Sequence, residues 1–221
     1  MTASRPCSEP GLPPVPRGRL IVLEGMPGAG KTTTATALAA LGHSVVGEYT
    51  SDTDAILEIH DHPAISDDDA HQANWLRKAA QCTARLASCP VVYADRDWLS
   101  SLSYACTADD GGELLARRAR WAARHLDDGT LLLPDVYAVF DLDPAASLSR
   151  RAGRLRPGHP WNQPAALNRL RDVYRDPARA LRPACPELGA ALSIPERIDI
   201  SGRDDLRRVL DRLAGLAATP A

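Results

Sequence analysis

An eight-residue phosphate-binding pattern constrains this chain more than any other feature. Residues 25–32 read Gly-Met-Pro-Gly-Ala-Gly-Lys-Thr, in which two glycines frame four residues and are followed by lysine and a hydroxyl residue. Glycines let successive backbone N–H groups curve around phosphate oxygens without an intervening Cβ, and a helix that follows directs its positive dipole end at the anion. The pattern therefore predicts a site for a nucleoside triphosphate.

The residues on either side of this loop favour that interpretation over a chance glycine-rich turn. Residues 19–24 form a branched apolar run typical of a buried parallel strand, and residues 33–41 favour a helix that ends before Gly42. Only two of the 26 basic residues are lysines, Lys31 and Lys78. A lysine at the end of the loop is therefore a specific choice in a chain that otherwise uses arginine.

The residues of the loop are expected to divide its work. Lys31 would reach the β and γ phosphates of ATP as a point charge, and the Thr32 hydroxyl would coordinate a Mg²⁺ ion that bridges them. The residues predicted to bind ATP are Gly25, Met26, Pro27, Gly28, Ala29, Gly30, Lys31, Thr32 and Thr33.

Length and composition favour one intracellular α/β domain. The 221 residues suffice for a single core. A net charge of −2 gives no reason to expect a nucleic-acid surface, and no apolar run approaches the length that spans a bilayer. The five cysteines include no CxxC pair, so we expect reduced thiols and a cytoplasmic protein. We expect a disordered proline-rich tail over 1–18, one domain over 19–217 and a short tail over 218–221.

Apolar runs and helical periodicity alternate along the whole chain. Strands are predicted at 19–24, 44–47, 90–94, 135–141 and 197–200. Helices are predicted at 33–41, 66–87, in segments up to about 126 with a break near 109–112, and at 144–152, 164–181 and 203–216. Strands that alternate with helices predict a parallel sheet with helices on both faces.

Polar residues stand where two of the predicted strands end. Glu48 follows the second strand, and Asp95 and Arg96 follow the third. In parallel sheets the ligand crevice lies outside the carboxyl ends of the strands, so these side chains are candidates for catalysis. Glu48 is open to two interpretations, a solvated acid or a base that accepts a proton from an alcohol.

Four stretches, taken in order, resemble the thymidylate kinase family and its deoxynucleoside kinase relatives within the P-loop nucleotide kinase fold. They are LEGMPGAGKTTT at 23–34, VVYADRDWLSSLSY at 91–104, PDVYAVFDLDPAASLSRRAGR at 134–154 and RIDISGRDDLRRVLDRL at 197–213. The resemblance covers roughly residue 19 to the C-terminus.

The resemblance implies a three-layer fold with a five-stranded parallel sheet, the first strand at its centre, and an arginine-rich lid near 150–162. It implies ATP and Mg²⁺ as cofactors, a small-molecule acceptor, and a possible homodimer. By the same resemblance Asp95 would hold a magnesium-bound water and Arg96 would reach the acceptor. The lid arginines Arg150, Arg151 and Arg154 would offer positive charge to the transferring group.

The acceptor side departs from the family pattern. Pro27 stands where many thymidylate kinases carry an aspartate, residues 48–50 replace the usual Arg-Glu-Pro-Gly sequence, and Asn74, Arg77 and Gln81 align only with a gap. The leading hypothesis is phosphoryl transfer from ATP to a nucleoside monophosphate or a nucleoside. The alternatives are a kinase for a hydroxyl of an antibiotic or biosynthetic intermediate, and a catalytically silent nucleotide-binding switch.

Overall fold

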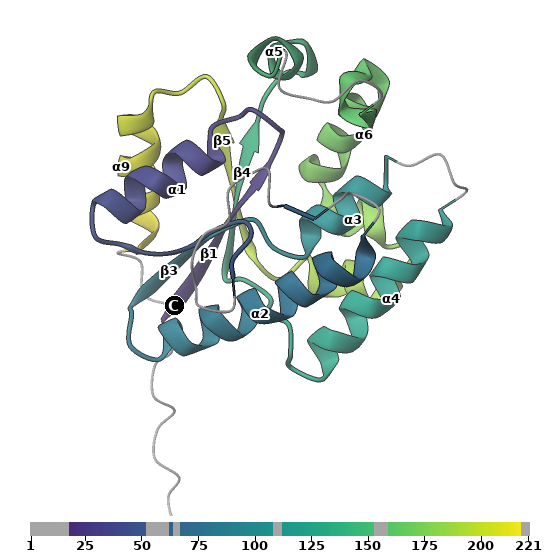
Figure 1. The fold of residues 1–221 in the computed structure, drawn as a ribbon, viewed down its shortest axis with the longest axis horizontal. Coiled ribbons are helices and arrows are strands. Elements are labelled where there is room, and N and C mark those ends of the chain that lie inside the picture. Colours follow the sequence, from purple (N-terminus) through teal and green to yellow (C-terminus); the bar gives the residue numbers. More distant parts are fainter. Residues whose placement is uncertain (1–17, 52–61, 64–66, 108–111, 153–158, 218–221) are drawn as a thin grey trace, which may run out of the picture.

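A computed structural model describes residues 18–51, 62–63, 67–107, 112–152 and 159–217. Five parallel strands form one sheet in the order β2-β3-β1-β4-β5, with the loop-bearing strand β1 at its centre (Figure 1). The strands are β1 (Arg19–Gly25), β2 (Ser44–Val46), β3 (Val91–Asp95), β4 (Val136–Asp141) and β5 (Glu196–Ser201). The predicted fold class and the central place of the first strand are confirmed.

Helices connect the strands throughout the part of the chain that the structure describes. They are α1 (Lys31–Ala40), α2 (Asp68–Leu86), α3 (Leu99–Ala105), α4 (Glu113–Asp127), α5 (Pro144–Arg150), the 3₁₀ helix η2 (Pro160–Asn162), α6 (Pro164–Arg175), α7 (Pro177–Leu181), α8 (Pro186–Ala191) and α9 (Leu206–Ala217). None of the described helices is both long and apolar enough to cross a bilayer.

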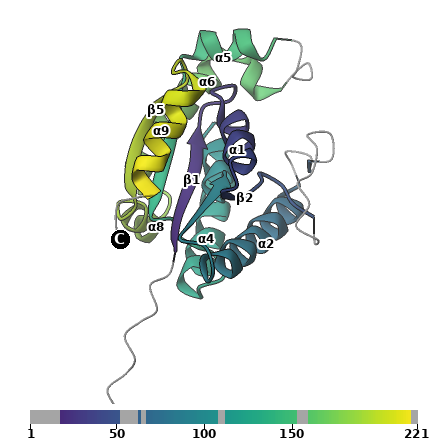
Figure 2. The ribbon, with the colours of Figure 1, turned by 90° about the vertical axis from the view of Figure 1, so that its left-hand side faces the viewer.

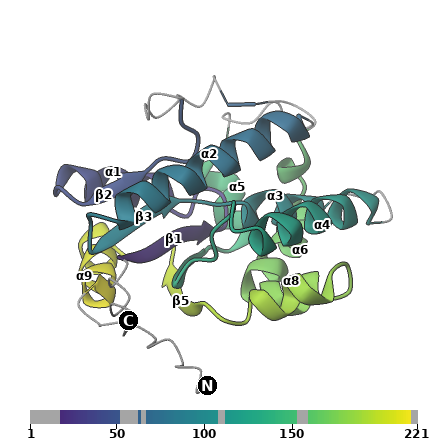
Figure 3. The same cartoon turned by 90° about the horizontal axis from the view of Figure 1, so that it is seen from below.

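The sheet separates two helical layers. Successive strand residues point to opposite faces. Accordingly Tyr93 points toward α9, where its hydroxyl donates to the Leu213 carbonyl, while the next residue, Ala94, lines a small cavity with Trp75 of α2. Helices α1 and α9 pack together, and in Figure 2 they are seen on either side of β1. Figure 3 shows α3, α4, α6 and α8 on the other side of the sheet from α9.

The middle of the sheet forms the core. Each side of β1 is paired, with Leu23 opposite Asp95 on β3 and opposite Ala138 on β4. Ile21 and Leu23 are fully buried, as a central strand of an α/β sheet requires. The pairing therefore fixes the end of β1, and with it the phosphate-binding loop, beside the ends of β3 and β4.

The helices differ from the expectations at several points. The helix predicted over 164–181 is two helices, because the Asp176 side chain caps a new helix that begins at Pro177. The short helix α8 was not predicted. Helix α2 begins at Asp68 with Asp67 as its cap, whereas residue 66, the predicted start of this helix, lies outside the described residues. Of the tail predicted over 1–18, residues 1–17 lie outside the described residues, as does the tail predicted over 218–221, and both tails remain predictions.

Candidate active site

The phosphate-binding loop begins at a glycine that no other residue can replace without rearrangement. Gly25 has a φ of +122°, and a Cβ placed on it would lie 2.3 Å from the carbonyl oxygen of Phe140 on β4. That close approach lets the N–H of Met26 donate to the same oxygen at 2.8 Å. The loop is thus anchored to β4 at its first residue.

The later glycines of the loop leave room for an anion. Gly28 and Gly30 have φ values of +73° and +103°, and a Cβ on Gly30 would meet no described atom within 4 Å. Gly30 directly precedes the first residue of α1, where backbone N–H groups lack helical partners. Open space before a helix N-terminus fits the phosphates of a nucleotide.

Lys31 lies under this loop, with a side chain that is 4% exposed. Its ammonium donates to the carbonyl oxygens of Gly25 at 2.9 Å and Met26 at 2.8 Å. Burial, followed by the positive charge of Arg96, lowers the pKa of Lys31 to about 7. An anion bound at the loop would favour the charged form of this lysine.

Asp95 ends β3 next to the loop strand. It is buried, and its Oδ1 atom has no hydrogen-bond partner among the described residues. Burial and the charge of Glu48 raise the pKa of Asp95. A buried carboxylate oxygen without a partner is a site where a bound cation would supply the missing interaction.

Two oxygen-bearing side chains at this edge, those of Thr32 and Asp95, are the predicted magnesium ligands. Thr32, at the start of α1, is exposed, so its hydroxyl is available to a ligand at the loop. No cluster of three His, Cys, Asp or Glu side chains suited to a metal occurs among the described residues. Thr32 and Asp95 therefore fit an ion that takes most of its oxygens from phosphate and water.

Arg96 connects the acids of the site. Its Nε lies 2.8 Å from Oε1 of Glu48, and its Nη1 lies 3.5 Å from Glu24 and 3.2 Å from the Ser100 hydroxyl. Although the Nε–Glu48 distance is that of an ion pair, its angle falls outside hydrogen-bond geometry. Arg96 has a φ of +68°, the one non-glycine residue among those described with a positive φ. A left-handed arginine is disfavoured, so surrounding contacts must hold it.

Glu24 is a site residue that the sequence reasoning missed. It is fully buried and accepts hydrogen bonds from the Asp97 N–H at 3.1 Å, the Ser100 hydroxyl at 2.8 Å and the Tyr174 hydroxyl at 2.9 Å. These bonds join the end of β1 to the turn after β3 and to α6. An acid at the last step of a buried strand, immediately before the glycine loop, was the available signal.

Helix α5 ties the start of the arginine-rich segment to the loop. The Ser147 hydroxyl donates to the Pro27 carbonyl at 2.7 Å, and Arg150 donates to the carbonyls of Gly28 at 3.1 Å and Gly202 at 2.7 Å. In this structure the Arg150 guanidinium therefore binds the backbone of the loop and of the turn after β5. The expected role of Arg154 falls in 153–158, outside the described residues.

Arg151 faces the site from the same helix end. Its guanidinium lies 5.4 Å from the ring centroid of Trp161, and a Cβ on Gly28 would meet its Cγ at 3.2 Å. Its Nη1 atom is buried with no hydrogen-bond partner among the described residues. Burial and the charge of Arg96 lower the pKa of Arg151 to about 10. Positive charges thus oppose one another around the loop.

Side chains of helix α2 hydrogen-bond to the segment that follows β2, mostly to its backbone. Asn74 donates to the Glu48 carbonyl at 3.1 Å and accepts from the Thr50 N–H at 3.3 Å. The Arg77 guanidinium donates to the Thr50 carbonyl at 3.0 Å, and the Gln81 amide oxygen accepts from the Thr50 hydroxyl at 3.0 Å. The polar residues that the sequence singled out on this helix therefore position 48–50.

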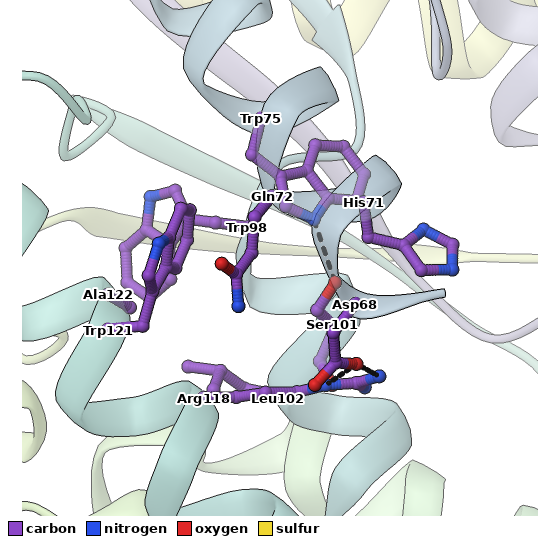
Figure 4. A pocket seen from close by; sticks show the side chains of 10 residues that line it. All are labelled: Asp68, His71, Gln72, Trp75, Trp98, Ser101, Leu102, Arg118, Trp121 and Ala122. Carbon is purple, nitrogen blue, oxygen red and sulfur yellow. Dashed lines mark hydrogen bonds and ion pairs between the residues drawn. The ribbon is translucent and has the colours of Figure 1, made fainter. Parts of the chain in front are cut away.

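A small pocket lies between α2, α3 and α4, away from the loop (Figure 4). Its walls include Trp75, Trp98 and Trp121, and an ion pair between Arg118 and Asp68 closes one side. The cavity volume of about 10 Å³ holds no more than a water molecule. The pocket contains none of the predicted site residues, and we interpret it as a packing defect.

Comparisons with known proteins place this geometry among P-loop folds. A family model described as an AAA domain matches residues 20–156. The structure is similar to that of deoxyadenosine kinase from M. mycoides with bound dATP, with a TM-score of 0.59, 12% identity, and coverage of 90% of this chain and 100% of that one.

Two further solved structures have the same fold. The M. mycoides enzyme with its products dCMP and a flexible dCDP matches with a TM-score of 0.58 and 14% identity, covering 89% of this chain and 99% of that one. Thymidylate kinase from Candida albicans matches with a TM-score of 0.53 and 16% identity, covering 90% and 91%. No curated protein matches the chain by sequence.

Proposed function

The chain belongs to the family described as an AAA domain, and from this premise we propose that it is an ATP- and magnesium-dependent phosphotransferase. It moves the γ-phosphoryl group of ATP to a small molecule of the nucleoside or nucleoside monophosphate class. The likeness in fold to deoxyadenosine kinase and thymidylate kinase supports this assignment of substrate class.

One observation carries the proposal, the gathering of cations around the loop. Burial, and then the charge of Arg96, lowers the pKa values of both Lys31, which donates to two carbonyls of the loop, and Arg151, which lies against Gly28. Cations that destabilise one another are relieved by an anion bound between them. A polyphosphate on the open loop supplies that anion.

The residues divide the reaction as follows. The loop N–H groups and Lys31 bind the β and γ phosphates, and Arg151 faces the equatorial oxygens of the transferring group. Mg²⁺ held by Thr32 and Asp95 would neutralise charge on the phosphates. As the bond from phosphorus to the β-γ bridging oxygen breaks, the acceptor oxygen bonds to phosphorus, and ADP leaves.

Glu48 favours a hydroxyl acceptor over a phosphate. Its carboxylate lies beside Arg96 and raises the pKa of Asp95, so it brings negative charge to the acceptor side. A phosphate acceptor, already ionised near neutral pH, would be repelled there and needs no base. A hydroxyl acceptor gives its proton to Glu48 during transfer. We therefore propose a nucleoside hydroxyl first, with Glu48 as base and Arg96 holding it in place.

A kinase for another small hydroxyl compound is the second candidate. Pro27, which is buried, occupies the position of the family's sugar-contacting aspartate, and Glu48-Tyr49-Thr50 replaces the family sequence after β2. These changes fall on the acceptor side, whereas the ATP side keeps the full loop pattern.

A panel of nucleosides, nucleoside monophosphates and unrelated alcohols, each with ATP and Mg²⁺, tests the proposal by mass spectrometry of the products. We expect one class to gain a phosphoryl group as ADP forms. In the productive reaction Lys31→Ala and Asp95→Ala each lower turnover at least about a hundredfold, because each removes charge from the transferring group. ATP binding without turnover on any acceptor would instead identify a nucleotide-binding switch.

A further inference from the structure

The short ladder between β2 and β3 ends just before the acceptor side of the site. Ser44, Val45 and Val46 pair with Val92, Tyr93 and Ala94, and no pairing follows. The next residues on the two strands are Gly47 and Asp95, which directly precede Glu48 and Arg96. The Glu48–Arg96 ion pair therefore lies beyond the last backbone rung that joins these strands.

Lys78 of α2 joins the two strands at that point. Its ammonium donates to the Gly47 carbonyl at 2.5 Å and to the Asp95 carbonyl at 2.6 Å. The side chain is 3% exposed, and burial lowers its pKa. A buried ammonium cannot hydrogen-bond to water, so it depends on acceptors within the protein. Its hydrogen bonds to the two backbone carbonyls are therefore strong and hold both strand ends.

The bond to Asp95 acts on the peptide that begins the left-handed turn. The N–H of this Asp95–Arg96 peptide donates to the Leu23 carbonyl on β1 at 3.0 Å, and its carbonyl accepts from Lys78. Both polar groups of one peptide are thus held from opposite directions. A left-handed conformation is disfavoured for arginine, and these two bonds hold the peptide against that preference.

The bond to Gly47 acts on the other partner of the ion pair. The Gly47 carbonyl precedes Glu48, and the Glu48 carbonyl accepts from Asn74 of the same helix at 3.1 Å. Helix α2 therefore holds the backbone on both sides of the Glu48 Cα atom. The side chain of Lys78, on the same helix, also hydrogen-bonds to β3.

The choice of lysine fits this role. Apart from Lys31, every other basic residue in the chain is arginine. A guanidinium presents a wide planar fork, whereas an ammonium is a compact donor on which two carbonyls converge. Both lysines of the chain thus donate to pairs of backbone carbonyls at the carboxyl edge of the sheet.

We propose that Lys78 is a positioning residue for phosphoryl transfer, because its ammonium fixes the ends of β2 and β3 and thereby the Glu48–Arg96 pair. Lys78 itself contacts neither ATP nor the acceptor. The inference rests on the proposed function for its effect on turnover. Its effect on the strand ends is measured separately.

Kinetics of Lys78→Met test the effect on turnover. Methionine keeps the length of the side chain and removes the donors. We expect kcat to fall about tenfold or more while the KM for ATP stays within about twofold, since misplacing an acceptor-side group costs rate and leaves the loop intact. In a Glu48→Gln background the further loss from Lys78→Met should shrink to less than about threefold, because both changes act on one group.

Amide hydrogen exchange tests the strand ends without any substrate. Lys78→Met should accelerate exchange in peptides that cover 46–50 and 95–98. The matched control is Arg85→Met, since Arg85 also lies on α2 and donates to β2, at the Val45 carbonyl, farther from the site. The control should leave both turnover and exchange at 95–98 unchanged.

The outcomes separate this inference from the proposed function. Unchanged exchange at both strand ends in Lys78→Met overturns the inference, as does faster exchange with wild-type kcat or with full additivity to Glu48→Gln. If wild-type protein transfers phosphate to no acceptor, the proposed function fails. The proposed role of Lys78 in turnover then fails as well. Faster exchange in Lys78→Met would in that case show only that Lys78 stabilises the strand ends.

Discussion

At the scale of single residues, Lys31 destabilises the ligand-free protein most at a pH below about 7, and progressively less as the pH rises toward its ordinary pKa of 10.5. Its pKa is about 7 in the fold and 10.5 ordinarily, so the unfolded chain binds more protons between those values. The free energy of unfolding contributed by this group therefore rises with pH across that window. We expect Lys31→Met to gain most in Tm over wild type near about pH 6 and least near about pH 10.

Thermal melts of both proteins across this range check the prediction for Lys31. Lys31→Arg is the control, because it keeps a charge at all these pH values. The difference in Tm between Lys31→Met and Lys31→Arg should therefore not shrink as the pH rises. A constant difference in Tm between Lys31→Met and wild type would mean that the lysine keeps its ordinary pKa.

Asp97 has the opposite dependence. Burial, and then the charge of Glu24, raises the pKa of Asp97 to about 7, while its hydroxyl partner Tyr137 donates at 2.8 Å. The folded protein thus binds more protons, and this contribution to stability, complete below about pH 4, is lost as pH rises through 7. Asp97→Asn should be more stable than wild type near about pH 8 and not near about pH 5, as measured by urea unfolding.

The sequence exposed some site residues and concealed others for physical reasons. Asp95, Arg96 and Glu48 stand at strand ends, where topology brings polar groups to one edge. Glu24 and Lys78 lie within patterns that predict only buried strand and amphipathic helix. Their partners are groups distant in sequence, such as the Tyr174 hydroxyl and the Gly47 carbonyl, which no local periodicity specifies.

At the scale of elements, the β1–β4 contact depends on Gly25. A Cβ atom at this position would lie 2.3 Å from the carbonyl oxygen of Phe140, and the substituted residue would have to keep a φ of +122°. We expect Gly25→Ala to lower the free energy of unfolding by more than about 2 kcal/mol. Gly42→Ala is the control, since Gly42 also has a positive φ but a Cβ there meets no described atom within 4 Å. Urea unfolding should give it about 1 kcal/mol, and equal losses in both variants would contradict the close approach.

Elements were predictable where the local signal was strong. The five strands follow apolar runs, and Pro144 marks the start of α5 as expected. The helix predicted over 164–181 failed at Asp176, because its side chain caps the next helix and Pro177 begins it, although apolar spacing continues across the break. Asp-Pro was the signal that should have ended the first helix.

At the scale of the whole molecule, ligand binding should stabilise the fold through the loop. ATP with Mg²⁺ at about a hundred times its Kd adds about 2.7 kcal/mol to the free energy of unfolding. We expect a rise in Tm of the wild type that Lys31→Ala loses. A thermal shift assay measures this, with adenine as the control ligand, because it lacks phosphates and is neither a nucleoside nor a nucleotide. An equal shift with adenine would place the binding energy away from the loop.

The order of strands was beyond periodicity. Alternation predicts a parallel sheet, and the family resemblance added only that the first strand lies at its centre. The full order β2-β3-β1-β4-β5 was not predicted, because pairing partners are set by contacts among segments far apart in the chain. The fold class and the central place of the loop-bearing strand could therefore be predicted, whereas the full strand order could not.

Because both lysines are buried, their amines should react slowly with acylating reagents in the native state. Its ε-amino groups belong to Lys31 and Lys78, each almost sealed inside the fold. A succinimidyl dye would acylate those amines only during excursions that open the interior. The rate of acylation at each lysine therefore measures how often the native state opens locally, at the phosphate loop for Lys31 and at the ends of β2 and β3 for Lys78.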